Sequence, residues 1–245
     1  GVQTCALPIY LQGRTLLPGF IDAHGHFMMA PQIVSFANLS AVPVGPNRTI
    51  RDVVNALKEN AATHKLPRGA WVMGYGYDAT ALEDRREMTV DDLDREFPDS
   101  PVMAVHVSGH GAVFNSAALK ILGITAETPA PAGGVIARKP GTSEPAGLLM
   151  ETAFMAAAAK LPQPGEEELL AQLGPAQRMY TSKGITTAQE GATHASELAF
   201  LRKAAERGRL DIDIVSLPFI TDVAKIFSAY LKTGPDGDRK STRLN

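Results

Sequence analysis

The stretch that decides the fold is Gln12-Gly-Arg-Thr-Leu-Leu-Pro-Gly-Phe-Ile-Asp-Ala-His-Gly-His26. Its apolar run from Leu16 to Ile21 is entered through Pro18-Gly19 and ends in polar residues, which predicts a short buried strand. Because alternate side chains of an extended chain share a face, His24 and His26 are expected to point the same way. Two neighbouring neutral imidazoles can bind one divalent ion, most readily zinc.

The His-x-His spacing taken alone is a weak signal, because paired histidines also occur as hydrogen-bonded core or surface residues. Asp22 precedes the pair by two residues and shares its predicted strand face. It is a candidate to orient one histidine through its carboxylate, with an ordinary polar residue at a strand end as the equal alternative.

The composition is that of an ordinary globular protein, with 44% hydrophobic and 20% charged residues among 245. The formal net charge of -2 supplies no basic field for phosphates, which argues against nucleic acid and anionic membranes as partners. The most apolar helical stretch, Thr152 to Ala159, is too short to cross a bilayer. We therefore expect a small-molecule substrate and a cytoplasmic location, with homo-oligomerisation left open.

The two ends are set apart from the rest of the chain. Residues 1–9 and 238–245 resemble read-through translations of sequencing-adapter DNA and are excluded from fold reasoning. The single cysteine, Cys5, lies in the first of these segments. The remaining chain has no thiol, which excludes disulfides and cysteine catalysis.

The pattern between the ends predicts two kinds of structure. From residue 166 onward helices and strands alternate, which is typical of parallel βα units. The middle does not follow that rhythm, so residues 46–160 are interpreted as an inserted α+β region between a barrel start at 10–45 and further βα units at 161–237. The predicted helices are 51–64, 116–122, 151–160, 166–182 with a break at Gly174-Pro175, 195–207 and 222–231; the predicted strands are 16–21, 70–77, 102–107, 185–188 and 212–217, with a hairpin around Pro140-Gly141.

Several segments together resemble metal-dependent hydrolases of the amidohydrolase superfamily, in its amidohydrolase 3 or YtcJ-like branch. The stretch from Gln12 to His26 resembles the motif that opens their barrel. Ser108-Gly-His-Gly-Ala-Val-Phe-Asn-Ser-Ala-Ala-Leu119, Gly133-Gly-Val-Ile and Glu144-Pro-Ala-Gly-Leu-Leu-Met-Glu151 resemble parts of an inserted region. Gly184-Ile-Thr-Thr-Ala-Gln-Glu190 resembles the second barrel strand. The resemblance covers nearly everything between the two adapter-like ends.

This resemblance implies an α/β fold, a partial (β/α)8 barrel, with the metal at the carboxyl ends of its strands. His24 and His26 would be the two metal ligands from the first strand. The family's other ligands come from the fourth, fifth, sixth and eighth strands, and the aspartate that acts as general base comes from the eighth. Only three barrel strands are predicted here, so most of the catalytic set is expected to be missing and the piece alone inactive.

The implied cofactor is a divalent metal, zinc by preference, and the implied reaction is hydrolysis of a non-peptide C-N bond by a metal-activated water. The alternative is a non-catalytic amidohydrolase-like protein that keeps the fold as a regulatory or binding module. Intact His24 and His26 argue against that alternative.

Other polar residues are weaker candidates. His110, Glu151 and Glu190 are predicted to line a substrate pocket, His110 because it lies in a strand-end loop that matches the family. His194 follows the same predicted strand as Glu190 and is a further candidate to line the pocket, with the start of a helix as the alternative. Lys225, which echoes a ligand-bearing lysine segment, is interpreted as a solvated helix residue because its neighbours have helical spacing. His106 is expected in the core, and His64 in solvent.

Overall fold

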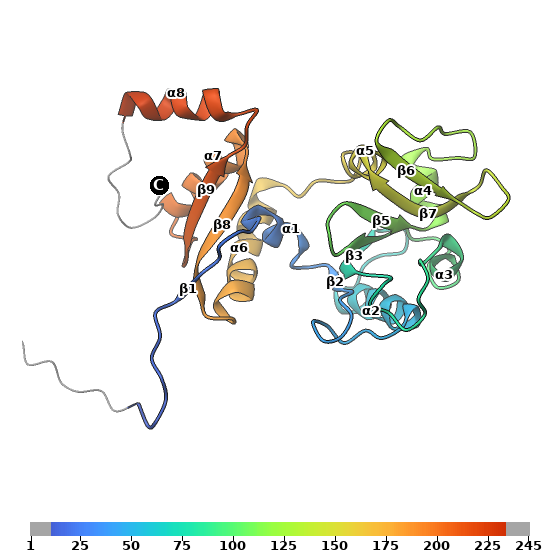
Figure 1. Cartoon of the computed structure of the whole chain (residues 1–245), viewed down its shortest axis with the longest axis horizontal. Helices are drawn as coiled ribbons and strands as arrows, with labels where there is room; N and C mark the ends of the chain where they lie inside the picture. Colours follow the sequence, from blue (N-terminus) through green and yellow to red (C-terminus); the bar gives the residue numbers. More distant parts are fainter. Residues whose placement is uncertain (1–10, 234–245) are drawn as a thin grey trace, which may run out of the picture. The chain divides into compact units, whose positions relative to one another are not determined.

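The computed structural model describes residues 11–233. The chain divides into two compact units: the first runs up to Val34 and resumes at Pro164, and the second is Ser35–Gln163. Together they form a mixed α/β fold (Figure 1). The adapter-like ends, with Cys5, lie outside the described residues. No helix within 11–233 is long and apolar enough to cross a membrane.

The first unit is a three-stranded parallel sheet in the order β1-β8-β9. Figure 1 shows these strands side by side, with helices connecting them. A core of large apolar side chains lies between sheet and helices, including Phe27, Leu173, Leu201 and Ile214. The elements are β1 (Phe20–Ile21), η1 (Phe27–Met29), α1 (Ala30–Ile33), α6 (Glu166–Thr181), β8 (Ile185–Thr193), α7 (Ala195–Glu206), β9 (Asp213–Pro218) and α8 (Val223–Thr233).

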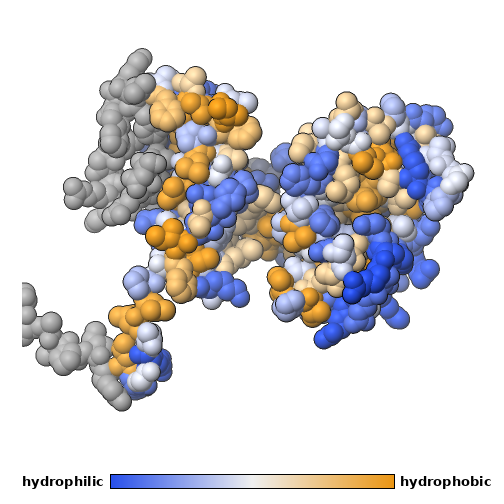
Figure 2. All heavy atoms as spheres, in the orientation of Figure 1, coloured by the Kyte–Doolittle hydropathy of each residue, from blue (hydrophilic) through white to orange (hydrophobic). Residues whose placement is uncertain are grey.

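The predicted buried strand from Leu16 to Ile21 is wrong in both length and burial. Only Phe20 and Ile21 form a strand, and they are 53% and 72% exposed. The reason is position, because β1 pairs with β8 on one side and is an edge of the described sheet. Figure 2 shows hydrophobic surface over this side of the first unit.

The predicted break in the helix at Gly174-Pro175 is also wrong. α6 continues through Pro175 to Thr181. A proline inside a helix loses one backbone hydrogen bond and crowds the preceding turn. Burial of Leu173, Ala176 and Gln177 on the packed face compensates, and the Gln177 amide bonds the backbone of the 209–212 segment on both sides.

The second unit is a six-stranded mixed sheet in the order β2-β3-β4-β5-β7-β6. The β2-β3 and β3-β4 pairs are parallel, and the others are antiparallel. Its two clusters of buried apolar side chains pack between this sheet and the helices. The elements are β2 (Ala37–Asn38), α2 (Ile50–Thr63), β3 (Val72–Tyr77), α3 (Val90–Asp94), β4 (Val102–His106), β5 (Gly111–Phe114), α4 (Ser116–Leu122), β6 (Gly134–Arg138), β7 (Pro145–Glu151) and α5 (Thr152–Ala158).

Most predicted elements of this unit are confirmed, among them α2, β3, β4, α4 and the β6-β7 hairpin. β5 was not predicted, because it is only four residues long, begins with a glycine and follows β4 after a short loop. Asn115 lies in the segment from Ser108 to Leu119, which resembles part of the family's inserted region. Fully buried, it caps α4 through Ala118 N–H and also bonds the backbone of Phe97, Ser100 and Val102. Its role is therefore structural.

Candidate functional site

The two histidines of the opening motif lie just beyond β1, where the chain continues along β8. The Asp22 N–H donates to the Thr187 carbonyl, and His26 forms an isolated bridge with Glu190. Because β1, β8 and β9 run parallel, this position is at the carboxyl end of the sheet. The His24 and His26 ring centroids are 5.5 Å apart at an interplanar angle of 78°, and both residues are exposed. The structure thus brings the two rings together at the strand ends.

Two glycines make this close approach possible. A methyl group at Gly25 would overlap the Asp22 carboxylate, so a larger residue between the histidines would displace that carboxylate. A methyl group at Gly191 would lie 3.1 Å from the Gly25 carbonyl oxygen, 3.3 Å from His24 Cε1 and 3.5 Å from His26 Cε1. The Gly191 N–H also donates to that carbonyl. The two imidazoles therefore sit against a cradle that any larger side chain would fill.

Glu190 is the carboxylate directly behind this pair. It is only 3% exposed and accepts hydrogen bonds from Met28 N–H (2.7 Å) and Ala192 N–H (3.1 Å). Its Oε1 lies 3.6 Å from His26 Nδ1. A buried carboxylate is costly unless such donors surround it, and here η1 and the last residues of β8 supply them. Because Nδ1 of His26 faces Glu190, Nε2 is the His26 nitrogen that faces away from this carboxylate.

Ser216 adds an unexplained polar atom at the same end of the sheet. It stands opposite Glu190 in the β8-β9 register. Its hydroxyl is buried and has no hydrogen-bond partner among the described residues, and neither does the Gln189 side-chain oxygen. Buried polar groups normally find partners. These two atoms therefore mark the carboxyl end of the sheet as a place where further polar contacts can form.

Asp22 lies against Gly25, whereas Glu190 is the carboxylate that approaches His26. The carboxylates of Asp22 and Glu190 both affect the pKa of Tyr180 on α6. Burial raises the pKa of the Tyr180 hydroxyl, and the Asp22 and Glu190 carboxylates add to the rise. The surroundings of the histidine pair are therefore acidic, which favours a cation.

His194 forms a second histidine-carboxylate pair in the first unit. It directly follows β8, and its Nδ1 lies 2.6 Å from Asp222 Oδ2 in the segment after β9. The Phe219 ring is 4.9 Å away. His194 also begins α7, where its N–H donates to Glu197. Burial raises the pKa of the Glu197 carboxyl, and the Glu190 carboxylate raises it further. The hydrogen bond from the His194 N–H acts in the opposite direction and lowers this pKa. The structure thus confirms that His194 begins a helix, whereas its role in lining a substrate pocket stays a prediction.

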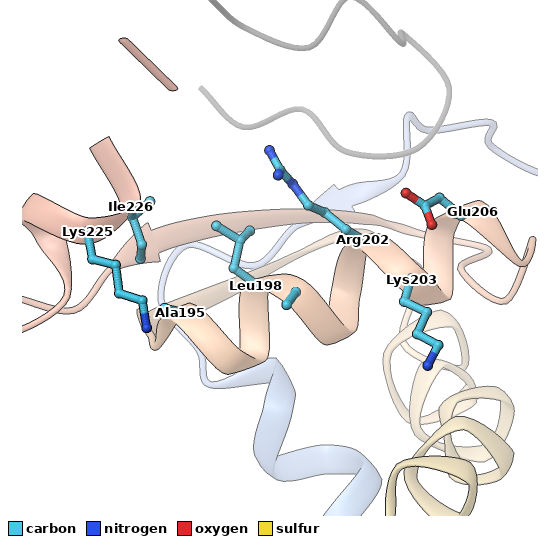
Figure 3. A pocket seen from close by; sticks show the side chains of 8 residues that line it. Ala195, Leu198, Arg202, Lys203, Glu206, Lys225 and Ile226 are labelled. Carbon is cyan, nitrogen blue, oxygen red and sulfur yellow. The ribbon is translucent and has the colours of Figure 1, made fainter. Parts of the chain in front are cut away.

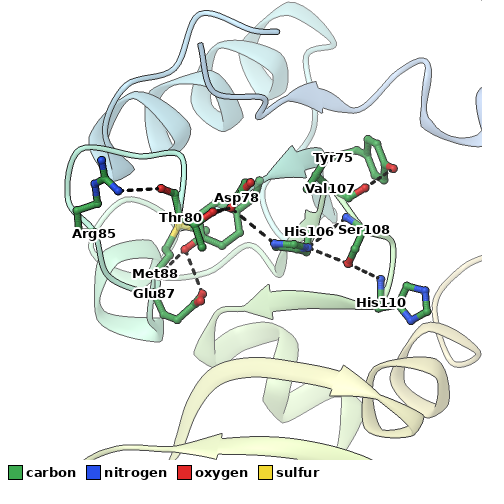
Figure 4. A network of polar contacts seen from close by, with 11 residues as sticks. Tyr75, Asp78, Thr80, Arg85, Glu87, Met88, His106, Val107, Ser108 and His110 are labelled. Atoms are coloured by element: carbon green, nitrogen blue, oxygen red, sulfur yellow. Dashed lines mark hydrogen bonds and ion pairs between the residues drawn. The ribbon is translucent and has the colours of Figure 1, made fainter. Parts of the chain in front are cut away.

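His110 and Glu151 belong to the second unit, where they pair with each other. His110 Nδ1 lies 3.1 Å from Glu151 Oε2. Nearby, His106 is half-buried and hydrogen bonded to Ser108 instead of lying in the apolar core (Figure 4). His64 is exposed, as predicted, with Nδ1 on the Asn60 carbonyl oxygen.

Lys225 lies exposed on α8, in line with its interpretation as a solvated helix residue. It lines a pocket of about 540 Å³ between α7 and α8, together with Ile226 and side chains of α7 such as Leu198 (Figure 3). The pocket lies between two helices, and none of the residues that line it is His24, His26 or Glu190.

The donor set at the strand ends suits a divalent metal without completing its coordination. Within residues 11–233 no group of three or more histidine, cysteine, aspartate or glutamate side chains could hold an ion. Paired neutral imidazoles with a carboxylate behind one of them are a common partial ligand set for zinc. His24 and His26 fit such an ion as two of its ligands.

Comparison with known proteins identifies the family. The sequence pattern described as "Amidohydrolase family" matches residues 9–243. The chain belongs to the amidohydrolase family. Within it, the chain is 33% identical over 181 residues to YtcJ of Bacillus subtilis (strain 168), whose name assigns it to the amidohydrolases, and 34% identical over 143 residues to the N-substituted formamide deformylase of Arthrobacter pascens. The resemblance to the YtcJ-like branch is thereby confirmed.

These matches cover 74% and 58% of this chain, but only 30% and 25% of the two relatives. Among solved structures, an uncharacterized metal-dependent hydrolase from Pyrococcus furiosus superimposes with a TM-score of 0.57 at 20% identity. That match covers 91% of this amidohydrolase chain and 42% of its neighbour. This match supports the mixed α/β fold of the chain.

Three residues of the site were missed by sequence reasoning: Gly191, Ser216 and Asp222. Gly191 directly follows the candidate Glu190, and a glycine beside a polar strand-end residue is a signal for close backbone approach. Ser216 and Asp222 gave no such signal, because their significance depends on which strands are neighbours.

Proposed function

We propose that this chain is part of a metal-dependent hydrolase that cleaves a non-peptide C-N bond of a small molecule, with His24 and His26 as two ligands of a divalent ion, zinc by preference. The observation that carries the proposal is the paired imidazoles at the carboxyl ends of parallel strands. When bound, the ion supplies a polarised water for attack on a carbonyl carbon.

The residues around the ion have distinct roles in this proposal. His26 presents Nε2, because its Nδ1 faces the Glu190 carboxylate. Glu190 is held by two backbone N–H donors and so fixes the orientation of that ring. Asp22, packed on Gly25, keeps the segment between the ligands compact.

The proposed architecture is a partial (β/α)8 barrel in which β1, β8 and β9 are successive barrel strands. Their parallel pairing and their order in the sheet support this, since each crossover contains a helix. Residues 46–160 are proposed as an inserted α+β region, supported by the separate compact unit Ser35–Gln163. Catalytic residues of such barrels lie at the carboxyl ends of the strands, where the histidine pair is found.

The C-N bond is favoured over other hydrolysable bonds by the relative named N-substituted formamide deformylase. His110 and Glu151 remain proposed residues of the substrate pocket. The net charge of -2 favours a neutral or mixed substrate over a phosphate ester.

The first test is Zn²⁺ titration of the ¹⁵N-labelled chain, followed on the imidazole resonances. We expect shifts at His24 and His26, none at His64, and loss of the response in the His24→Ala, His26→Ala double variant. His64→Ala is the matched control, because it also removes an exposed imidazole. Zinc-induced shifts at His64 of the same size, or an unchanged response in the double variant, would refute the metal site. Amine release from N-substituted formamides by the zinc-loaded longer protein tests the bond type.

A further inference from the structure

The second unit contains a strained acidic residue at the end of β7. Glu151 has φ 53° and ψ -128°, a backbone conformation that residues with a Cβ rarely adopt. Strain of this kind persists only where surrounding structure enforces it, and it is frequent at functional sites. Glu151 does not use its side chain to cap α5, which begins at the next residue. Local secondary structure therefore gives no reason for a glutamate here.

The neighbouring strand holds Glu151 in this conformation. The Glu151 N–H donates to the His110 carbonyl at 2.8 Å, directly after the pairing of Gly111 with Met150. A methyl group at Gly111 would overlap the Met150 sulfur and approach the Leu149 carbonyl oxygen to 2.8 Å. β5 and β7 are therefore packed too closely for the chain at Glu151 to relax.

The strain places the Glu151 carboxylate on His110. Glu151 Oε2 lies 3.1 Å from His110 Nδ1, which assigns the proton to Nδ1 and leaves the Nε2 lone pair as an acceptor. The His110 backbone is fixed as well, since its N–H donates to the Ser108 hydroxyl, which His106 holds at 2.8 Å (Figure 4). The His110 side chain is 58% exposed. A ring oriented from both sides thus remains open to solvent.

We propose that His110 is a ligand-binding imidazole of the second unit that accepts a hydrogen bond through Nε2 from the O–H or N–H of a small molecule, and that Glu151 is its positioning residue. The strain at Glu151 is tolerated because it holds the carboxylate on the ring. This proposal rests on the assignment of His110 to the substrate pocket in the proposed function and gives the residue its role there. Because its observations come only from residues of the second unit, a failure at His110 can be distinguished from a failure of zinc binding at His24 and His26.

Diethyl pyrocarbonate is a suitable probe, because it reports on an accessible neutral imidazole nitrogen. The nitrogen attacks a carbonyl carbon, the bond from that carbon to the ethyl carbonate group breaks, and the leaving group takes up a proton and decays to carbon dioxide and ethanol. His64 is the internal comparator: it is also exposed, but its Nδ1 bonds a backbone carbonyl at 3.0 Å instead of a carboxylate. A carboxylate partner keeps the proton on Nδ1 and the lone pair on Nε2 more firmly than a carbonyl does.

In the full chain at mildly alkaline pH we expect His110 to be modified several-fold faster than His64, measured by peptide mass spectrometry. Glu151→Gln should lower the His110 rate to that of His64 and leave His64 unchanged. Acetamide at high concentration should protect His110 more than His64. Equal rates at the two histidines in the unaltered chain, or equal protection, would overturn the proposal.

Glu151→Gly separates positioning from structure, because glycine accepts the strained backbone without penalty. We expect this variant to unfold at a higher temperature than the unaltered chain and yet to react more slowly at His110. If the His110 rate were unchanged in both Glu151→Gly and Glu151→Gln, and Glu151→Gly still raised the Tm, Glu151 would have no role beyond the fold.

Discussion

At the scale of single residues, the geometry at the end of β1 depends on small side chains as much as on ligands. Gly25 and Gly191 allow two imidazoles and a buried carboxylate to share a small volume. Glu190 is satisfied by backbone donors on both sides, so its position does not depend on a bound ion. The proposed ligands are thus oriented by the protein in advance.

Gly191→Ala tests that arrangement at one position. The added methyl would lie 3.1 Å from the Gly25 carbonyl oxygen and 3.3 Å from His24 Cε1, both tighter than ordinary contact, so the Gly25 carbonyl and the His24 ring have to shift by a few tenths of an ångström. We expect affinity for Zn²⁺ to fall about tenfold or more, the size typical of changes that misorient a metal ligand, as measured by calorimetric titration.

Gly165→Ala is the control for this experiment, because a methyl at Gly165 meets no atom within 4 Å. If Gly191→Ala bound zinc as tightly as the control, the cradle would have no part in holding the two histidines.

At the scale of elements, the capping of α2 shows how local sequence fixes a helix start. Thr49 and Asp52 form a capping box, in which the Thr49 side chain accepts from Asp52 N–H and the Asp52 carboxylate accepts from Thr49 N–H. Arg48 N–H and Thr49 N–H hold the pKa of the Asp52 carboxyl below its ordinary value, with a smaller opposing effect of burial. This arrangement is readable from the Thr-x-x-Asp spacing alone.

The lowered pKa predicts a pH dependence of stability. A carboxyl group whose pKa is lower in the folded state stabilises the fold above its ordinary pKa, and that contribution is lost as the pH falls through the folded value. Asp52→Asn should therefore be less stable than the unaltered chain near neutral pH, with the difference shrinking below a pH of about 4. Urea unfolding followed by circular dichroism measures this.

Glu59→Gln, which changes an exposed carboxylate on the same helix, is the control because Glu59 does not cap the helix. A stability difference for Asp52→Asn that stayed constant from neutral to acid pH would contradict the capping explanation.

At the scale of the whole molecule, each unit has buried clusters made of its own residues. Leu201 is fully buried in the first unit and Leu57 in the second. Truncating a fully buried leucine to alanine costs about 2–5 kcal/mol. We expect Leu57→Ala to reduce amide hydrogen-exchange protection in residues 35–163, and Leu201→Ala to reduce it in the βα units from residue 164 onward.

Each variant is the control for the other in this experiment. Loss of protection in both units from either single truncation would show that the two cores unfold as one, contrary to this expectation.

The sequence predicted most elements because their signals are local. The helical spacing of apolar residues, the stop at Gly123, the Pro140-Gly141 turn and β-branched runs mark α2, α4, the β6-β7 hairpin and β3 without reference to the rest of the chain. It failed where distant partners decide. The burial of Leu16 to Ile21 depends on what covers the strand, and the continuity of α6 through Pro175 depends on packing around Gln177.

For the candidate site the division is similar. The sequence by itself determined the family-like motif and the pair His24 and His26, because an extended chain puts alternate side chains on one face. Only the tertiary structure decided that Glu190 stands behind His26, that Gly191 leaves room for both rings, and that Glu151 is strained against His110. The physical reason is that these relations join residues far apart in the sequence, up to 167 positions for Gly191 and His24. Strand register, which local patterns do not encode, sets which of them meet.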